Sequence, residues 1–201
     1  MTDPLSFRIK KKIDRYIHDP IVALIILPFF LILKILPFKI SSLICGSLVY
    51  LIAPFTKYQK RVLNNLNIAF PQKKEAEKIK ISKRFWFNFG QIIGELPHID
   101  KIISSKKILI SGHKKIQKGP AILIGAHLAN WEFLLRIGEM SGRRVSFVYR
   151  PINNWILNKL QFSRNSKINA DFFKKGRTAA IGMAIKLKKG EVIGLTNDQI
   201  L

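Results

Sequence analysis

The chain has 201 residues and a mass of 23.1 kDa, which is enough for one domain with a hydrophobic core. Lys and Arg number 35 against 12 Asp and Glu, so the formal net charge is +23, while 48% of the residues are hydrophobic. This apolar content excludes a disordered basic tail, and the single cysteine excludes a fold held by internal disulfides. The charge predicts a polyanionic partner, which is a nucleic acid, an anionic membrane or an acidic protein.

Two uncharged apolar runs lie near the N-terminus, over residues 21–33 and 40–55. Each run is shorter than the roughly 20 residues of a comfortable membrane-spanning helix. Pro28 and Pro37 are expected to kink or break any helix that runs through them. No small-residue cleavage site follows the first run, which argues against a cleaved signal peptide. We therefore interpret the two runs together, as a helical hairpin or re-entrant membrane anchor that turns at residues 36–38.

Basic residues flank both outer ends of this anchor. By the positive-inside rule, both ends and everything downstream are expected on the cytoplasmic side of the membrane. We predict a membrane anchor over residues 1–56 and a second domain over residues 57–201. A buried two-helix core in a soluble protein is the alternative.

Residues 56–96 follow a helical pattern. Thr56 is suited to cap a first helix that ends at Pro71, and a second helix is expected to begin near Gln72. The charged stretch over residues 73–84 predicts a solvated helix face. The aromatic residues that follow recur at helical spacing, which is typical of a stripe facing the core, with a partly lipid-facing stripe as the alternative. This stripe comprises Phe85, Phe89, Ile92 or Ile93, and Leu96.

Beyond Pro97, short apolar runs alternate with helical segments. Strands are expected over residues 108–110, 121–126, 145–149 and 192–196. Helices are expected over residues 131–140, 155–162 and 177–187. This alternation predicts right-handed βαβ units, and hence an α/β fold with a mostly parallel sheet flanked by helices. Ligands bind such sheets beyond the carboxyl ends of the strands, so that edge is where chemistry is expected.

The strand expected over residues 121–126 delivers His127 at its carboxyl end. Glu132 follows in the first turn of the next helix, which Asn130 is placed to cap. Chain reversal is expected to bring the carboxylate to one imidazole nitrogen and leave the other to take a proton, as in the general-base half of a catalytic triad. No G-x-S-x-G elbow occurs, and Cys45 lies in the anchor. The proton would then come from a substrate hydroxyl, which predicts direct acyl transfer without a covalent enzyme intermediate.

Taken alone, this histidine and glutamate have an alternative interpretation as a polar helix start with a structural histidine. No metal site is predicted, because no second His or Cys lies at ligand spacing nearby. His18, His98 and His113 lie in loop or flanking sequence, and no special role is expected for them.

Other polar residues follow the neighbouring strands at the same edge. Arg150 follows the strand over residues 145–149 and suits bidentate recognition of a phosphate or carboxylate; an exposed charge before a proline turn is the alternative. Asp198 follows the strand over residues 192–196, with a turn or helix cap as the alternative. Arg164 and Arg177 are further candidates for phosphate binding.

With these residues in place, the sequence resembles the bacterial lipid A biosynthesis late acyltransferases, the lauroyl/myristoyl transferase family. The similar features follow one another in order along nearly the whole chain. They are the apolar N-terminus, an N-L-x-x-A-F-P signature within residues 61–71, the aromatic helix ending at Gly94 and Glu95, G-A-H-L-A-N-W-E over 125–132, Y-R-P over 149–151, L-K-K-G-E-V-I over 187–193, and D-Q at 198–199.

The resemblance implies a glycerolipid-acyltransferase-like α/β fold at the cytoplasmic face of the bacterial inner membrane. His127 matches the family's catalytic histidine and Glu132 its acidic partner, while Arg150 and Asp198 match positions similar to acceptor and active-site binders. The implied acyl donor is a thioester on acyl carrier protein, with no further cofactor. The implied acceptor is a hydroxyl of a phosphorylated, Kdo-bearing lipid A precursor. These partners and the inner membrane are anionic, in agreement with the positive charge, and no nucleic acid is implied.

Members of that family continue beyond the Asp-Gln pair, so the sequence is expected to lack a C-terminal part that carries further strands and helices of the sheet. A related acyltransferase that acts on a lysophospholipid or another glycolipid shares the catalytic pair and is one alternative. A non-catalytic, membrane-anchored binding module is an alternative of another class, and it predicts that His127 is dispensable.

Overall fold

The computed structural model describes residues 9, 12–105, 111–116, 118–165 and 168–196. The chain divides into two compact units. A helical unit comprises residues 30–104, and a sheet unit comprises residues 105–201 together with residues 1–29. That residues 1–56 form a membrane anchor and residues 57–201 a second domain stays a prediction.

The apolar N-terminal segment forms two helices. A short π-helical turn, Asp14–His18, runs directly into α2 (Asp19–Ile35), and α3 covers Phe38–Ile52. The break between them falls at residues 36 and 37, which confirms the predicted turn. Pro28 lies inside α2, so the helix does not break at that residue, and the predicted kink stays a prediction. A proline removes one hydrogen bond from a helix, and the other turns of a long apolar helix hold it together.

Both helices are long enough to cross a membrane, by length and composition. They extend beyond the uncharged runs, over 22 residues in Asp14–Ile35 and 18 residues in Phe38–Phe55. Only 17% and 28% of their most apolar stretches are buried, and Ile35 and Phe55 are 84% and 90% exposed. Exposure of this kind favours a membrane anchor over a buried two-helix core.

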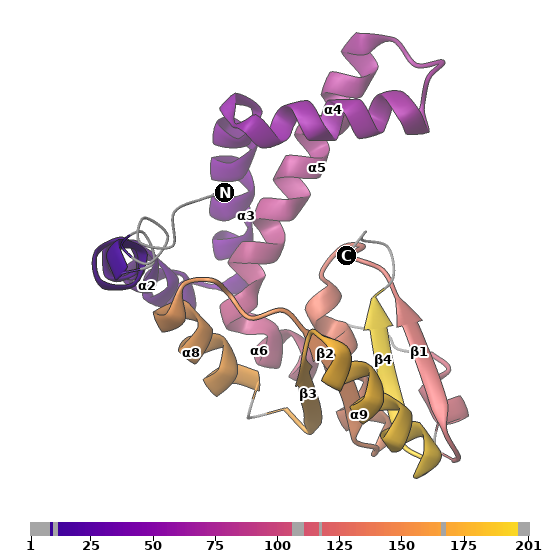
Figure 1. The fold of residues 1–201 in the computed structure, drawn as a ribbon. Coiled ribbons are helices and arrows are strands. Elements are labelled where there is room, and N and C mark those ends of the chain that lie inside the picture. Colours follow the sequence, from indigo (N-terminus) through magenta and orange to yellow (C-terminus); the bar gives the residue numbers. More distant parts are fainter. Residues whose placement is uncertain (1–8, 10–11, 106–110, 117, 166–167, 197–201) are drawn as a thin grey trace. The chain divides into compact units, whose positions relative to one another are not determined.

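The helical unit continues with three further α-helices. They are α4 (Lys57–Ala69), α5 (Glu75–Glu95) and α6 (Ile99–Ser104), with 3₁₀ turns at Ala53–Phe55 and Leu96–His98 (Figure 1). Thr56 precedes α4 as predicted, although its hydroxyl donates back to the carbonyl oxygen of Ala53 at 2.7 Å instead of capping the helix. The charged start of α5 is exposed as predicted except at Lys78, which is buried and paired with Glu75 at 3.0 Å.

The buried face of α5 includes two glycines, and most of the predicted aromatic stripe lies outside it. Phe85 is 46% exposed, and Ile92 is the one stripe residue that is fully buried. The buried face comprises Lys78, Ser82, Trp86, Gly90, Ile92 and Gly94. A Cβ atom at Gly90 would collide with the backbone of Cys45 in α3, and one at Gly94 with the backbone of Ser41. The glycines therefore let the backbones of α3 and α5 touch, an approach that aromatic side chains would prevent.

A buried polar cluster compensates for the missing N–H of Pro37. In a continuous helix the carbonyl oxygen of Leu33 would accept a bond from residue 37, and proline has no N–H to donate. The hydroxyl of Ser41 donates to this oxygen at 2.8 Å, and Nε2 of His98 lies 2.8 Å from it. All three residues are fully buried. The prediction that His98 lies in flanking sequence without a special role is therefore wrong, because it holds the hairpin turn.

Within the described residues, the sheet unit is built on four parallel strands. They are β1 (Ala121–Gly125), β2 (Val145–Tyr149), β3 (Ala170–Lys174) and β4 (Val192–Thr196), in the order β1-β4-β2-β3. This order confirms the predicted α/β fold with its parallel sheet. The strand β3 was not predicted, and the strand expected over residues 108–110 lies outside the described residues.

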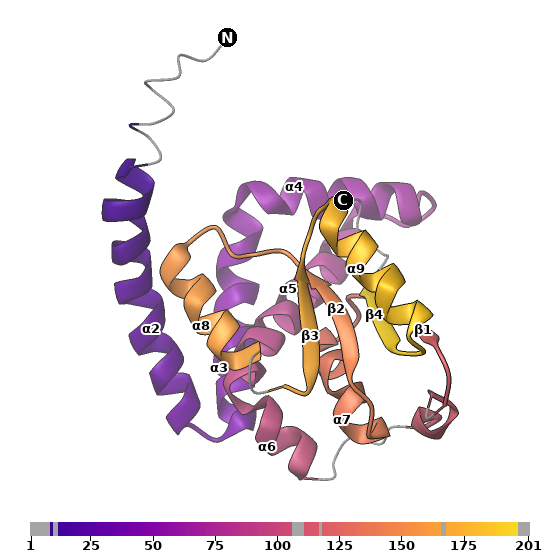
Figure 2. The same cartoon turned by 60° about the horizontal axis from the view of Figure 1, so that its bottom comes forward.

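Helices connect the strands of the sheet. The described ones are η5 (Trp131–Arg136), α7 (Ile137–Ser141), α8 (Trp155–Asn165) and α9 (Arg177–Lys188), while η4 (His113–Ile116) precedes β1. The helix predicted over residues 131–140 therefore begins as a 3₁₀ helix. Helix α9 lies alongside β3 and β4 (Figure 2), where Lys186 forms an ion pair with Asp171 at 2.8 Å. The core gathers Val145, Phe147, Ile168, Ala170 and Val192.

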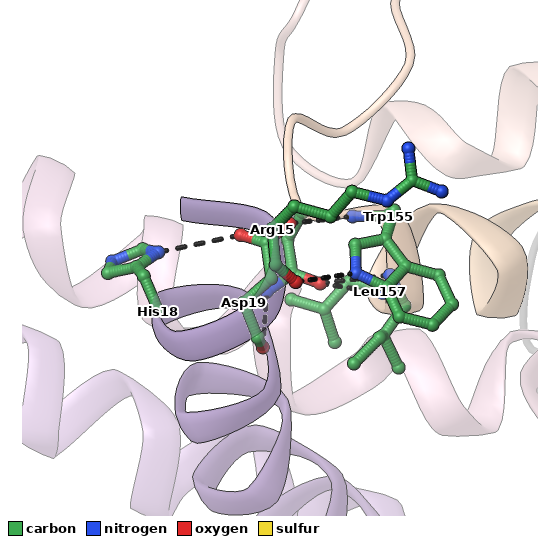
Figure 3. Close-up of polar contacts among 7 residues, drawn as sticks. Arg15, His18, Asp19, Trp155 and Leu157 are labelled. Carbon is green, nitrogen blue, oxygen red and sulfur yellow. Dashed lines mark hydrogen bonds and ion pairs between the residues drawn. The ribbon is translucent and has the colours of Figure 1, made fainter. Parts of the chain in front are cut away.

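The first turn of α2 belongs to the sheet unit and contacts α8 (Figure 3). Oδ2 of Asp19 accepts a hydrogen bond from the backbone N–H of Trp155 at 3.2 Å, and its carbonyl oxygen accepts one from the Asn154 side chain at 2.8 Å. The indole N–H of Trp155 donates to the carbonyl oxygen of Arg15 at 3.1 Å. The apolar N-terminal helix thus begins on the helix that follows β2.

Candidate functional site

The carboxyl ends of the strands meet at one edge of the sheet, as the sequence predicts. Gly125 of β1 pairs with Thr196 of β4, and Tyr149 of β2 pairs with Lys174 of β3. His127 follows β1 by two residues, and Arg150 directly follows β2. Asp198 lies outside the described residues, two positions beyond the end of β4.

A cavity of about 420 Å³ lies over this edge and the adjoining face of the sheet. His127, Glu132 and Arg150 all line it. The other lining side chains are mostly apolar or aromatic and come from the strands and from η5, among them Leu123, Leu134, Leu135, Phe147, Phe172 and Leu195. A largely apolar cavity with a few polar groups is the usual form of a site for a small or lipid-like ligand.

The loop between β1 and η5 fixes the neighbourhood of the histidine. The ring of Trp131 meets that of His127 edge-on, with centroids 5.0 Å apart. The Asn130 side chain accepts a hydrogen bond from the Glu132 N–H at 3.2 Å, as expected of a helix cap. Ala129 adopts a φ of 46°, in the left-handed region that favours glycine. This turn reverses the chain, so that both His127 and Glu132 reach the cavity.

The remaining predicted residues differ in their relation to the cavity. Asn130 is buried beside it, and its side-chain oxygen is engaged by the backbone of Glu132. Arg177 is exposed in the first turn of α9 and does not line the cavity. Arg164 lies in the last turn of α8, and the position of its side chain is outside the described part of the chain. The structure thus brings together three of the predicted residues, the imidazole, the carboxylate and one guanidinium.

Sequence reasoning missed two kinds of residue in the cavity wall. Thr196 lines it because β4 lies between β1 and β2, an order that the sequence did not reveal. Gln161 lines it from α8, and its buried Oε1 atom has no hydrogen-bond partner among the residues that the structure describes. The sequence offered one signal for Gln161: it lies four residues after Leu157, which places the two side chains on the same face of the helix.

The carboxyl edge of this parallel sheet carries a histidine, an acid and an arginine in one mostly apolar cavity, an arrangement suited to an enzyme that acts on an apolar substrate. The family model of the bacterial lipid A biosynthesis acyltransferases matches residues 8–201, and the chain belongs to this family. A comparison with curated proteins gives no match. The protein is therefore an enzyme of lipid A biosynthesis that transfers an acyl group to a lipid acceptor. Family membership confirms the resemblance seen in the sequence and sets aside the non-catalytic binding module.

Proposed function

We propose that the enzyme transfers a fatty acyl chain from a thioester on acyl carrier protein to a hydroxyl of a phosphorylated, Kdo-bearing lipid A precursor. His127 is the general base and Glu132 orients it. The observation that carries this proposal is that both side chains line the same mostly apolar cavity at the carboxyl edge of the sheet. Such a cavity suits an acyl chain and excludes water from the reacting thioester.

In the proposed reaction, an imidazole nitrogen of His127 takes the proton of the acceptor hydroxyl as its oxygen attacks the thioester carbonyl carbon. The tetrahedral intermediate then collapses, the carbon–sulfur bond breaks, and the leaving thiolate takes the proton from the imidazolium. The product is an oxygen ester, and the base is regenerated. No cofactor takes part in this reaction as written.

The surroundings of His127 support its role as a base. The edge-on contact with Trp131 limits the rotation of the imidazole ring. Glu132 in turn has its backbone N–H held by the Asn130 side chain, which fixes the start of η5. A carboxylate that orients a histidine also stabilises the imidazolium that forms when the proton is taken.

We assign Arg150 to the anionic part of the substrates. It lines the cavity and is exposed, so its guanidinium can reach a phosphate or carboxylate at the edge of the lipid. Asn130, Arg164, Arg177 and Asp198 are further substrate-binding candidates. The net charge of +23 supports association with an acidic carrier protein and with the anionic inner membrane, with the site on the cytoplasmic face.

The test is an assay of the protein with dodecanoyl and tetradecanoyl acyl carrier proteins and a phosphorylated disaccharide lipid acceptor. We expect His127→Ala and Glu132→Ala each to lower turnover by about 10²-fold or more. His18→Ala and Glu77→Ala serve as matched controls, because their side chains do not line the cavity and are exposed to solvent. Unchanged turnover in His127→Ala would eliminate the mechanism. Parallel reactions with a lysophospholipid and with a mannoside glycolipid test the alternative acceptors.

A further inference from the structure

An amide side chain in the cavity wall has an unfilled hydrogen bond. Gln161 lines the cavity from α8, and its Oε1 atom is buried and has no hydrogen-bond partner among the described residues. A buried polar atom without a partner costs free energy that an apolar side chain would not cost. Native structures leave few such atoms, and each calls for an explanation.

The buried hydroxyl of Ser146 provides a contrast within the same sheet unit. Its Oγ also has no partner among the described residues, yet Ser146 does not line the cavity. A serine hydroxyl is small and its hydrogen rotates to suit its surroundings, whereas a primary amide presents a fixed acceptor and a fixed donor. Gln161 therefore combines two features, an unfilled acceptor and a place in the wall of the substrate cavity.

Helix α8 holds this amide in place. Its first turn is capped by Asn154, whose Oδ1 accepts hydrogen bonds from the N–H groups of Ile156 and Leu157 at 3.0 and 3.1 Å. Asp19 accepts a further bond from Trp155 N–H at 3.2 Å (Figure 3). Gln161 lies about 9 Å further along the helix axis than Trp155. With the start of α8 fixed, the helix cannot rotate freely to bring the amide into water.

The chemistry of the cavity decides what completes the bond. Donor groups such as those of Arg150 and Thr196 line the same cavity, yet no described residue donates a hydrogen bond to Oε1. A hydrocarbon chain has no donor either, so an O–H or N–H group of a substrate is the partner that suits this acceptor. Both proposed substrates carry such groups close to the reacting atoms, as hydroxyl and amide groups of the lipid acceptor and as amide groups of the thioester arm.

We propose that Gln161 is a substrate-binding residue, which accepts a hydrogen bond from an O–H or N–H group of the lipid acceptor or of the thioester arm next to His127. This inference rests on the proposed function, since it uses the same cavity and the same substrates. It extends that function to a residue outside the motifs by which the sequence resembles its family.

The test measures substrate affinity and stability together in Gln161→Leu, with Gln72→Leu, an exposed glutamine, as the matched control. We expect the KM of one substrate to rise about threefold to tenfold, the range of one neutral hydrogen bond. The Tm should stay the same or rise, because the variant removes an unpartnered buried acceptor. Gln161→Glu keeps an acceptor at the same position and should recover part of the lost affinity. Gln161→Met repeats the apolar replacement in case leucine packs badly.

The arms of the experiment identify the ligand. A raised KM for the acyl carrier protein thioester alone assigns the bond to the donor arm, and a raised KM for the disaccharide lipid alone assigns it to the acceptor. Unchanged KM values for both substrates overturn the inference. So does a fall in Tm in both apolar variants, which would show that the amide is structural.

Binding measured without turnover separates this inference from the proposed function. Dissociation constants of both substrates are compared between His127→Ala and the double variant His127→Ala/Gln161→Leu. Retained turnover in His127→Ala would overturn the proposed base, while a weaker dissociation constant in the double variant would still support Gln161. Lost turnover in His127→Ala with equal dissociation constants would overturn the role of Gln161 alone.

Discussion

The carboxylate of Asp19, at the start of the apolar helix α2, accepts a hydrogen bond from the backbone N–H of Trp155, the first residue of α8. The two residues are 136 positions apart in the sequence. A buried carboxylate at a helix N-terminus is stabilised by the N–H groups that have no partner within the helix. The N-terminal helix is therefore joined to the sheet unit through specific polar contacts and is more than a detached tether (Figure 3).

The first prediction concerns this carboxylate. Asp19→Ala leaves the Trp155 N–H without its acceptor and should lower the free energy of unfolding of the sheet unit by about 1–3 kcal/mol. Asp19→Asn keeps an acceptor oxygen and should recover part of that loss. Denaturant unfolding monitored by Trp155 fluorescence measures both variants. Asp14→Ala removes an exposed acid from the preceding turn and should have little effect; equal losses in Asp14→Ala and Asp19→Ala would contradict the role of the contact.

The second prediction concerns the turn between α2 and α3. His98→Phe and Ser41→Ala each remove one of the groups that satisfy the carbonyl oxygen of Leu33. Each should destabilise the helical unit by about 1–3 kcal/mol, because a buried carbonyl then loses a partner. The two losses should not add, since both side chains bond the same oxygen.

A third substitution provides the control for that turn. Pro37→Ala supplies an N–H at the position that helical geometry assigns to the Leu33 carbonyl. In the His98→Phe background it should restore part of the lost stability, as measured by unfolding in detergent micelles. If the losses in His98→Phe and Ser41→Ala added strictly and Pro37→Ala restored no stability, the two side chains would not replace the hydrogen bond that Pro37 cannot donate.

The third prediction is a pH dependence that arises away from the cavity. Burial by itself would raise the pKa of Asp171, but hydrogen bonds and charge from Lys186 and Arg144 outweigh it and hold the pKa below its usual value. A carboxyl whose pKa is lower in the folded chain stabilises the fold above its unfolded pKa of about 3.9 and loses that contribution as the pH falls through the folded value.

Acid titration of stability checks this coupling. The free energy of unfolding should decline as the pH is lowered below about 4, and Asp171→Asn should make the decline shallower. Asp100→Asn serves as the comparison, because its exposed side chain lies on α6 in the other unit. If the free energy of unfolding declined with falling pH equally in the wild type and in Asp171→Asn, the ion pairs of Asp171 would not cause the decline.

The parallel sheet was predictable because its strands and helices alternate with clear boundaries. The strands over residues 145–149 and 192–196 match the structure residue for residue. Parallel strands end at a common edge, so His127, Glu132 and Arg150 were expected near one another before any coordinates were known. Strand β3 escaped notice because the charged Asp171, its second residue, interrupts its apolar pattern, and the lysine that pairs with this acid comes from α9.

Features that depend on a distant partner were not predictable. Gly90 and Gly94 form a buried helix face only because the backbone of α3 lies against them, whereas the sequence alone favours the larger aromatic residues as core. The Oε1 atom of Gln161 likewise becomes a buried acceptor without a partner among the described residues only once α8 packs beside the cavity. Periodicity reports which residues share a face, but it does not report what covers that face.

The fourth prediction concerns the turn that carries His127 and Glu132, the proposed catalytic pair. Ala129 has a φ of 46°, and a residue with a Cβ atom pays about 1–2 kcal/mol in the left-handed region. Ala129→Gly should relieve this strain and raise the free energy of unfolding. Because glycine also gains entropy in the unfolded chain, which opposes that effect, the net rise should be at most about 1 kcal/mol. Turnover should fall at the same time, because a more flexible turn positions His127 and Glu132 less firmly.

Ala129→Val tests the opposite direction. A β-branched residue is strongly disfavoured at positive φ, so the free energy of unfolding of this variant should fall by more than about 1 kcal/mol. Thermal unfolding and the acyl-transfer assay are measured on both variants and on Ala180→Gly, an exposed helical position in α9 that should lose stability through helix propensity alone. If Ala129→Gly destabilised the protein as Ala180→Gly does, the backbone at Ala129 would not be strained. The proposed catalytic pair would then owe its position to the contacts of Trp131 and Asn130.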